Sequence, residues 1–405
     1  MIKKAGLMAL AVYLLLTLLS PGLVHAHGGL AVVESSARPE FPLRLHFALS
    51  AESDVNITDI RLRYTVDRES FARVTSETYI EFVPATTVDI GWTLEMVRIG
   101  GLPPGSSLDY WWVLEDASGS RVETAPVRIQ FDDKRYSWQN LTEGKVTIYW
   151  YDRGESFVQE LMASAQQALA RLAEDTGAYL ERPVKIFVYA STRDLQEAMI
   201  FPQEWTGGVA FTRYGIVSIG IAWNALDWGK RAIVHELTHL VIHQMTFNPY
   251  GDLPSWLNEG LAMYAEGALE PGYAGLLDKA IAEEALISVR SLSSPFSAYA
   301  EQSLLAYAQS YSLVEFLIDN YGQGKMLELL NTFEQGSGYD GALENVYGFD
   351  MDGLDDMWRD SVTGAGQSVA REGVYTAQTG IFAVAAGLLV GLGLVVRYKG
   401  LGLKL

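Results

Sequence analysis

The sequence contains no cysteine among its 405 residues. This absence excludes disulfides, cysteine-ligated metal sites and cysteine nucleophiles. Histidine is scarce, at six residues, and basic residues are outnumbered, because 30 lysines and arginines face 49 aspartates and glutamates. The formal net charge of −19 and the lack of a basic patch in the sequence argue against a nucleic-acid partner.

The longest apolar runs lie at the two ends of the chain. At the start, Lys3 and Lys4 precede an apolar run over residues 5–19, and "VHA" provides small residues for cleavage after Ala26. These features predict a secretory signal peptide over residues 1–26. The alternative is an uncleaved membrane anchor, which the shortness of the run disfavours.

At the other end, no charged residue occurs between Gly373 and Val396, and basic residues follow from Arg397 onward. This pattern predicts a transmembrane helix over residues 376–396 and a cytoplasmic tail over residues 397–405. A buried C-terminal helix is the alternative, although the segment shows no amphipathic period. Together the two ends predict a single-pass protein of the cell membrane with an extracytoplasmic N-terminal ectodomain.

Residues 27–135 contain short runs rich in β-branched and aromatic residues, separated by clusters of Asp, Ser, Gly and Pro. This spacing predicts an all-β sandwich. The stretch "GLPPGSSLDYWWVLED" resembles the turn and following strand of an immunoglobulin-like or fibronectin type III-like domain. We expect no catalytic residue in this domain.

Residues 140–368 show a different pattern and are expected to form a second domain. Apolar residues from Phe157 to Leu172 follow helical spacing, and Gly177 marks the end of that helix. "PVKIFVYAS" and "GGVAFTRYGIVSIGIA" predict strands, and nearly everything from Asp227 to Val362 predicts helices. The expected fold is an α+β domain whose small mixed sheet is covered by helices, with a mostly helical C-terminal part.

Three of the six histidines lie in "RAIVHELTHLVIHQM". His235 and His239 are four residues apart, so a helix places both on one face, where their imidazoles can bind one zinc ion. Glu236 lies about 100° round the helix from His235, which directs it toward the open coordination position as a general base. The alternative is an ordinary buried helix that happens to contain histidine.

The stretch "DLPSWLNEGLAMYAEG" follows this helix. With it the chain resembles the gluzincin metallopeptidases, in particular the peptidase MA-like group, in which a second helix with Asn-Glu-Gly follows HExxH. The resemblance implies a zincin-like fold and one Zn²⁺ per chain, held by His235, His239 and Glu259. Glu266 matches a carboxylate of related aminopeptidases and is expected to orient a ligand histidine, with a solvated surface charge as the alternative.

A third stretch, "LLAYAQSYSLVEFLIDNYG", resembles the helix after the zinc site in these families. The resemblance implies that Tyr307 donates a hydrogen bond to the developing oxyanion. Tyr311, one turn later, competes for this role, and a tyrosine that only packs in the core is the alternative. No histidine follows His243, which excludes a downstream catalytic histidine. His243 itself is expected to be structural.

In zincins an edge strand beside the active-site helix pairs with extended substrate backbone. The candidates for this strand here are Ile216, Val217, Ser218, Ile219, Gly220 and Ile221. The aminopeptidase branch carries a Gly-x-Met-Glu-Asn motif nearby, which holds the free amino group of the substrate. This chain has "GGVAF" there instead, and the departure favours internal cleavage.

These observations predict a membrane-anchored, extracytoplasmic zinc metallopeptidase that hydrolyses peptides or proteins, endopeptidase-like in action. Its expected partners are a peptide substrate and, through the C-terminal helix, the membrane. One alternative is an aminopeptidase of the same superfamily. The other is a non-catalytic surface binding protein with a degenerate zincin domain, against which the intact Glu236 argues.

Overall fold

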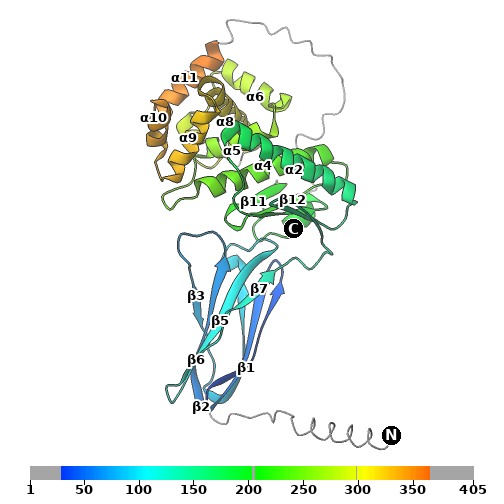
Figure 1. The fold of residues 1–405 in the computed structure, drawn as a ribbon, viewed down its shortest axis with the longest axis vertical. Coiled ribbons are helices and arrows are strands. Elements are labelled where there is room, and N and C mark those ends of the chain that lie inside the picture. The colour runs from blue at the N-terminus through cyan, green and yellow to red at the C-terminus, as the bar shows by residue number, and fades with distance from the viewer. Residues whose placement is uncertain (1–28, 203–205, 298, 365–405) are drawn as a thin grey trace, which may run out of the picture.

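The computed structural model describes residues 29–202, 206–297 and 299–364. Figure 1 shows an elongated molecule with a sheet-rich N-terminal region at one end, helices at the other and a second sheet between them. The predicted signal peptide over 1–26, transmembrane helix over 376–396 and tail over 397–405 lie outside the described residues. The cellular location inferred from these segments therefore stays a prediction.

Seven strands of the N-terminal region join in one hydrogen-bonded sheet. The first half of β2 pairs with β1 and β4, and its second half pairs with β3 and β5, all antiparallel. β6 and β7 extend the sheet from β5, and a 3₁₀ turn, η1, follows β4. The elements are β1 (Ala31–Glu40), β2 (Arg44–Asp67), β3 (Ser76–Tyr79), β4 (Ala85–Glu95), η1 (Met96–Arg98), β5 (Ser106–Asp116), β6 (Arg121–Glu123) and β7 (Val127–Phe131).

The length of β2 overturns the predicted all-β sandwich. Its 24 residues continue as strand through "SAESDVN", a polar stretch of the kind that separates strands in a sandwich. The register shifts between Glu52 and Ile57, where the strand bends and its pairing passes from β4 to β5. Because β2 connects strands that would otherwise belong to separate layers, the region is a single sheet, and the sandwich prediction is wrong.

The second sheet is mixed, with the strand order β11-β12-β10-β9-β8. Its three central strands are parallel, and the two edge strands run antiparallel to their neighbours. Helices α2 and α4 cover one face, and the N-terminal region lies toward the other (Figure 1). The elements are β8 (Gln139–Glu143), β9 (Val146–Trp150), β10 (Val184–Tyr189), β11 (Gly208–Phe211), β12 (Ile216–Gly220), α2 (Glu155–Thr176) and α4 (Leu226–Thr246).

The helical periodicity is confirmed in this part of the chain. Helix α2 contains the predicted apolar series and ends at Gly177, whose φ of 70° is the left-handed conformation that glycine adopts readily. From Asp227 to Val362 the described chain is almost entirely helical, as expected. The remaining elements are α3 (Thr192–Gln196), η2 (Thr212–Tyr214), α5 (Ser255–Glu266), α6 (Pro271–Ala282), α7 (Val289–Leu292), α8 (Ala300–Tyr321), α9 (Gln323–Glu334), α10 (Tyr339–Tyr347) and α11 (Met351–Gly364).

The predicted fold class also included a transmembrane helix over residues 376–396, which lies outside the described residues. Over the part of the chain that the structure describes, no helix combines the length and the apolar character that crossing a bilayer requires. The observed class is mixed α/β, with a sheet-rich N-terminal region followed by a largely helical part. The predicted class, which began with a sandwich domain, is therefore wrong.

The N-terminal region and the second sheet share an apolar cluster and several specific contacts. Phe41 of the N-terminal region packs with the cluster that contains Phe187 of β10. Lys185 Nζ donates to the Gly105 carbonyl at 2.7 Å. The ring of Phe71 stacks on Phe247, just past the end of α4, with centroids 4.1 Å apart. The N-terminal region is thus in direct contact with the helix that carries the histidines.

Candidate metal centre

Helix α4 is buried along most of its length, against α2, α5 and the second sheet. His235, Glu236 and His239 are 9%, 7% and 9% exposed. The two histidine rings have centroids 4.8 Å apart, as residues one helical turn apart require. Burying three such polar side chains costs free energy unless each is hydrogen-bonded or paired with a charge. The groups that contact them therefore indicate what the site can bind.

Helix α5 brings Glu259 to both histidines. Glu259 Oε2 lies 3.4 Å from His235 Nε2 and 3.5 Å from His239 Nε2. Within the described residues this buried oxygen has no hydrogen-bond partner. Two imidazole nitrogens and one carboxylate oxygen that converge in this way match the three-ligand set of a catalytic zinc site. The residues predicted as ligands therefore fit a zinc ion.

Gly260 lets α5 come close enough to place Glu259 there. A Cβ atom at Gly260 would lie 2.6 Å from Val314 Cγ2 of α8 and even closer to the Ser310 carbonyl oxygen. Such distances are shorter than van der Waals contact, so only glycine allows the two helices to pack at this separation. The depth at which Glu259 enters the site is set by this contact.

The other ring nitrogen of each histidine is also held. His235 Nδ1 donates to Glu266 Oε1 at 2.8 Å, and His239 Nδ1 donates to Asn258 Oδ1 at 3.2 Å. Because these oxygens can only accept, each Nδ1 carries a proton, and Nε2 is the ring atom that remains to bind a cation. Glu266 makes the contact that its expected role requires. Sequence reasoning gave Asn258 no role, although it directly precedes Glu259.

The charges of the site favour ionised carboxylates around the histidines. Burial alone would lower the pKa of His235, but the neighbouring carboxylates of Glu259 and Glu266 raise it well above its usual value. Burial alone would raise the pKa of Glu259, but His239 and His235 hold it well below its usual range. Glu259 is thus a carboxylate at neutral pH, ready to bind a divalent cation.

Glu236 projects toward β11. A Cβ atom at Gly208 of β11 would lie 2.7 Å from Glu236 Oε1, so the absent side chain makes room for this carboxylate. Burial raises the pKa of Glu236, although His235 and His239 oppose the shift. A carboxylate whose pKa is raised is a stronger base, which suits proton transfer near neutral pH. The structure thus places Glu236 beside the ligands without making it one of them.

The structure separates the two candidate tyrosines of α8. The ring centroid of Tyr307 lies 6.3 Å from that of His235, and the Phe296 ring packs edge-on with Tyr307 at a centroid distance of 5.1 Å. The hydroxyl of Tyr311 instead donates to Glu315 at 2.9 Å. Burial, with the nearby carboxylates of Glu259 and Glu236, raises the pKa of Tyr307 well above its usual value. Tyr307 therefore stays protonated beside the metal centre.

The predicted substrate-pairing strand is in the wrong place. Residues 216–220 form β12, which pairs with β10 on one side and with β11 on the other, and Ile221 follows it. Its backbone is therefore used within the sheet, and the edge strand is β11, Gly208–Phe211. The apolar run over 216–221 predicted a strand correctly, but a run of buried residues marks an internal strand rather than an edge.

His243 lies one turn beyond His239 and makes no contact with Glu259 that would include it in the metal centre. Its Nε2 is 3.5 Å from Glu69 Oε2, in the loop after β2. Burial lowers the pKa of His243, although Glu69 opposes this shift. Sequence reasoning missed Glu69, because it lies in a region where no site was expected and no motif marks it.

Among the comparisons with known proteins, the match to a family model agrees with a zinc-binding site in this part of the chain. Residues 164–364 match the family model of the Peptidase MA superfamily. Among curated proteins, none matches the chain.

Several solved structures resemble the chain only weakly. An M1 zinc metallopeptidase from Deinococcus radiodurans is 14% identical over 83% of this chain and 94% of its own, with a TM-score of 0.34. Legionella pneumophila aminopeptidase A is 13% identical over 81% of this chain and 49% of its own, with a TM-score of 0.38. OgpA from Akkermansia muciniphila is 7% identical over 26% of this chain and 28% of its own, with a TM-score of 0.20. The chain thus spans under a third of OgpA, and likeness at this level carries no argument about activity.

The family match covers the helices that hold the metal centre, and the side chains of that centre form a three-ligand set. The family match and the geometry of the site together support the interpretation of this chain as a gluzincin-like, zinc-dependent metallopeptidase.

Proposed function

We propose that the chain is a zinc endopeptidase. The observation that supports this most strongly is the convergence of His235 Nε2, His239 Nε2 and Glu259 Oε2, with the carboxylate of Glu236 beside them. A zinc ion held by these ligands supplies Lewis-acid chemistry, which activates water and polarises the scissile carbonyl.

The side chains around the ligands supply the remaining steps. Glu236 takes a proton from the attacking water and passes it to the leaving amine nitrogen, so its carboxylate is regenerated in each cycle. The protonated phenol of Tyr307 donates a hydrogen bond to the substrate oxygen as negative charge develops on it. The free edge of β11 offers backbone donors and acceptors to an extended substrate.

Internal cleavage is favoured by the residues at the free edge. An aminopeptidase needs an acidic group to hold the substrate's free amino group, but β11, Gly208–Phe211, carries no acidic side chain. Glu69 approaches the same helix near His243, yet it is ion-paired with Arg182. Both features favour a substrate whose chain continues past the site.

The test compares wild-type protein with Glu236→Gln, using metal analysis and a fluorescence-quenched peptide with a blocked N-terminus. We expect wild type to bind one zinc ion and to cleave this peptide internally. Glu236→Gln should keep the metal and lose at least about a hundredfold in kcat, because the general base is gone. Glu174→Gln, an exposed position on α2, is the matched control and should keep both properties.

Three results would count against the proposal. Wild-type turnover by Glu236→Gln would remove Glu236 from the mechanism. Cleavage restricted to peptides with a free N-terminus would replace the endopeptidase with an aminopeptidase. If zinc-loaded wild-type protein cleaved neither the blocked peptide nor a peptide with a free N-terminus, the result would favour a non-catalytic binding protein.

A further inference from the structure

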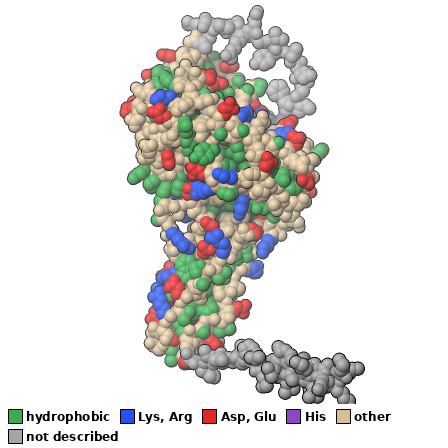
Figure 2. Space-filling model, in the orientation of Figure 1, with side chains coloured by type: hydrophobic (Ala, Val, Ile, Leu, Met, Phe, Trp, Pro, Cys, Tyr) green, Lys and Arg blue, Asp and Glu red, His purple; other side chains and the backbone are tan. Residues whose placement is uncertain are grey.

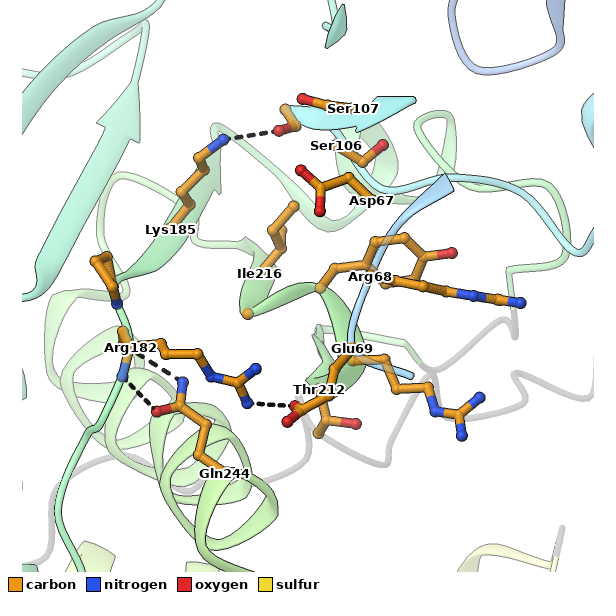
Figure 3. Close-up of a pocket in the computed structure, with 15 residues that line it drawn as sticks. Asp67, Arg68, Glu69, Ser106, Ser107, Arg182, Lys185, Thr212, Ile216 and Gln244 are labelled. Carbon is orange, nitrogen blue, oxygen red and sulfur yellow. Dashed lines mark hydrogen bonds and ion pairs between the residues drawn. The ribbon is translucent and has the colours of Figure 1, made fainter. Parts of the chain in front are cut away.

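A second cavity lies where the N-terminal region meets the second sheet, separate from the metal centre. Its volume is about 280 Å³, near the lower end of the volumes typical of small-molecule sites. In Figure 3 Lys185 and Arg182 extend into the space from one side, and Arg68 and Glu69 lie across from them. The C-terminal end of β2 and the starts of β5, β10 and β12 surround it, with η2 and the last turn of α4.

Four basic side chains line this cavity in a chain whose net charge is strongly negative. They are Arg68, Arg182, Lys185 and Arg213. Figure 2 shows basic side chains around the waist between the N-terminal region and the helical part. Since the chain as a whole is acidic, such a gathering of positive charge needs a specific explanation.

The two acidic residues of the cavity do not neutralise all of this charge. Glu69 is ion-paired with Arg182, and Asp67 is 3.2 Å from Arg128, which lies outside the cavity lining. Asp67 and Glu69 are thus both already engaged.

The other three cations have no carboxylate partner in the described part of the chain. Lys185 Nζ contacts only the neutral Gly105 carbonyl, and Arg213 lies over the ring of Phe247 at 5.6 Å. Arg68 and Arg213 are exposed and form the rim, whereas Lys185 is half-buried. Three unpaired positive charges around one cavity repel one another, and an anion bound among them would relieve that repulsion.

We propose that this cavity binds a phosphate group. A phosphate carries more than one negative charge and several acceptor oxygens, which suits cations arriving from three separate segments better than a monocarboxylate does. The hydroxyls of Ser107 and Thr212, also in the lining, add neutral donors. The group arrives either as the free ion or as an ester on a small molecule, since both present the same oxygens.

A bound phosphate would join the two parts of the molecule. Lys185 belongs to the second sheet and Arg68 to the N-terminal region, so the ligand bridges them. Gln244 of α4 also lines the cavity and lies five residues after His239. Phosphate therefore binds at the base of the helix that carries the metal ligands, without touching them.

The test titrates the full-length protein with inorganic phosphate and, separately, with glycerol 3-phosphate, by calorimetry and thermal unfolding. Ionic strength is held constant with chloride. We expect saturable binding and a rise in Tm with one or both ligands. Tighter binding of inorganic phosphate would identify the free ion as the ligand, and tighter binding of glycerol 3-phosphate would identify a phosphate ester. Arg68→Gln, Arg213→Gln and Lys185→Met should each weaken binding at least tenfold. Arg98→Gln, an exposed arginine away from the cavity, should bind within twofold of wild type.

The exposed rim variants keep the test informative even if Lys185→Met fails to fold. Unchanged affinity in both Arg68→Gln and Arg213→Gln would overturn the proposal. So would a Tm response that chloride reproduces at equal ionic strength. Acetate that binds as tightly as phosphate would overturn the assignment to a multivalent oxyanion. None of these measurements depends on peptide hydrolysis.

Discussion

Substitution of Gly260 by alanine tests whether the packing of two helices controls metal binding. The added Cβ would lie 2.6 Å from Val314 Cγ2 and 2.9 Å from the Ser310 carbonyl carbon. Ordinary carbon contacts need about 3.5 Å, so α5 must retreat from α8 by about 1 Å. The backbone of Ser310 cannot rotate away as a side chain can, and the helix must therefore move.

Two opposing terms decide the size of the effect. Alanine gains up to about 1 kcal/mol over glycine in a helix, whereas overpacking a tight core costs about 1–3 kcal/mol. Because the clash involves backbone atoms, we expect the upper part of that range and a net loss of about 1–2 kcal/mol. Glu259, the adjacent residue, would move with the helix, and a 1 Å displacement of a site residue can cost about a hundredfold in activity.

The assay combines thermal unfolding with zinc content after dialysis against a weak chelator. Gly275→Ala is the matched control, since Gly275 lies in helix α6 and no atom approaches its hypothetical Cβ within 4 Å. The control should keep the metal and match or exceed wild-type stability. If Gly260→Ala melted with wild type and retained its zinc, the close approach of α5 and α8 would not be what positions Glu259.

Three further predictions concern side chains around the site. Glu266→Ala should weaken zinc affinity about 10- to 100-fold in chelator competition, because the ring of His235 loses its Nδ1 acceptor; equal affinity would contradict this role. Burial lowers the pKa of His243 below its ordinary 6.5, so its contribution to stability is present above pH 6.5 and is lost as the pH falls through the folded-state pKa. In denaturant titrations from pH 7.5 to 5, the free energy of unfolding should therefore fall less steeply in His243→Gln than in wild type. An equal fall in both proteins would refute this. A double-mutant cycle on Phe71→Ala and Phe247→Ala should give a coupling free energy of about 0.5–1.5 kcal/mol, and additive effects would show that the stacked rings do not join the two regions.

The proximity of the two histidines predicted as ligands could be foreseen because their spacing is a local property of helices. Residues four apart share a face in any α-helix, so predicting that His235 and His239 lie side by side required no knowledge of the fold. Glu259 could be predicted only through the resemblance of its motif, since a separation of twenty positions from His239 fixes no distance. Asn258 stands beside it in the same motif, but nothing in the sequence tells which way an amide oxygen points.

Strand pairing was harder to predict because it depends on distant segments. The apolar run at 216–221 predicted a strand, yet only the pairing of β12 with β10 shows that it is internal. The polar stretch inside β2 had the composition of a turn, yet the strand pairs up to Glu52 and again from Ile57, and its backbone continues as strand between them. The approach of Glu69 to His243 joins residues far apart in the chain, and no short-range pattern encodes it.

Both ends of β2 lie at the joint with the second sheet. The strand begins three residues after Phe41, which packs with the cluster of Phe187, and it ends just before the loop carrying Glu69 and Phe71. The bend between Glu52 and Ile57, where pairing passes from β4 to β5, is therefore the part of β2 that lies away from this joint. Force applied at the bend would reach the second sheet through two strand segments of one continuous chain, which would share the load.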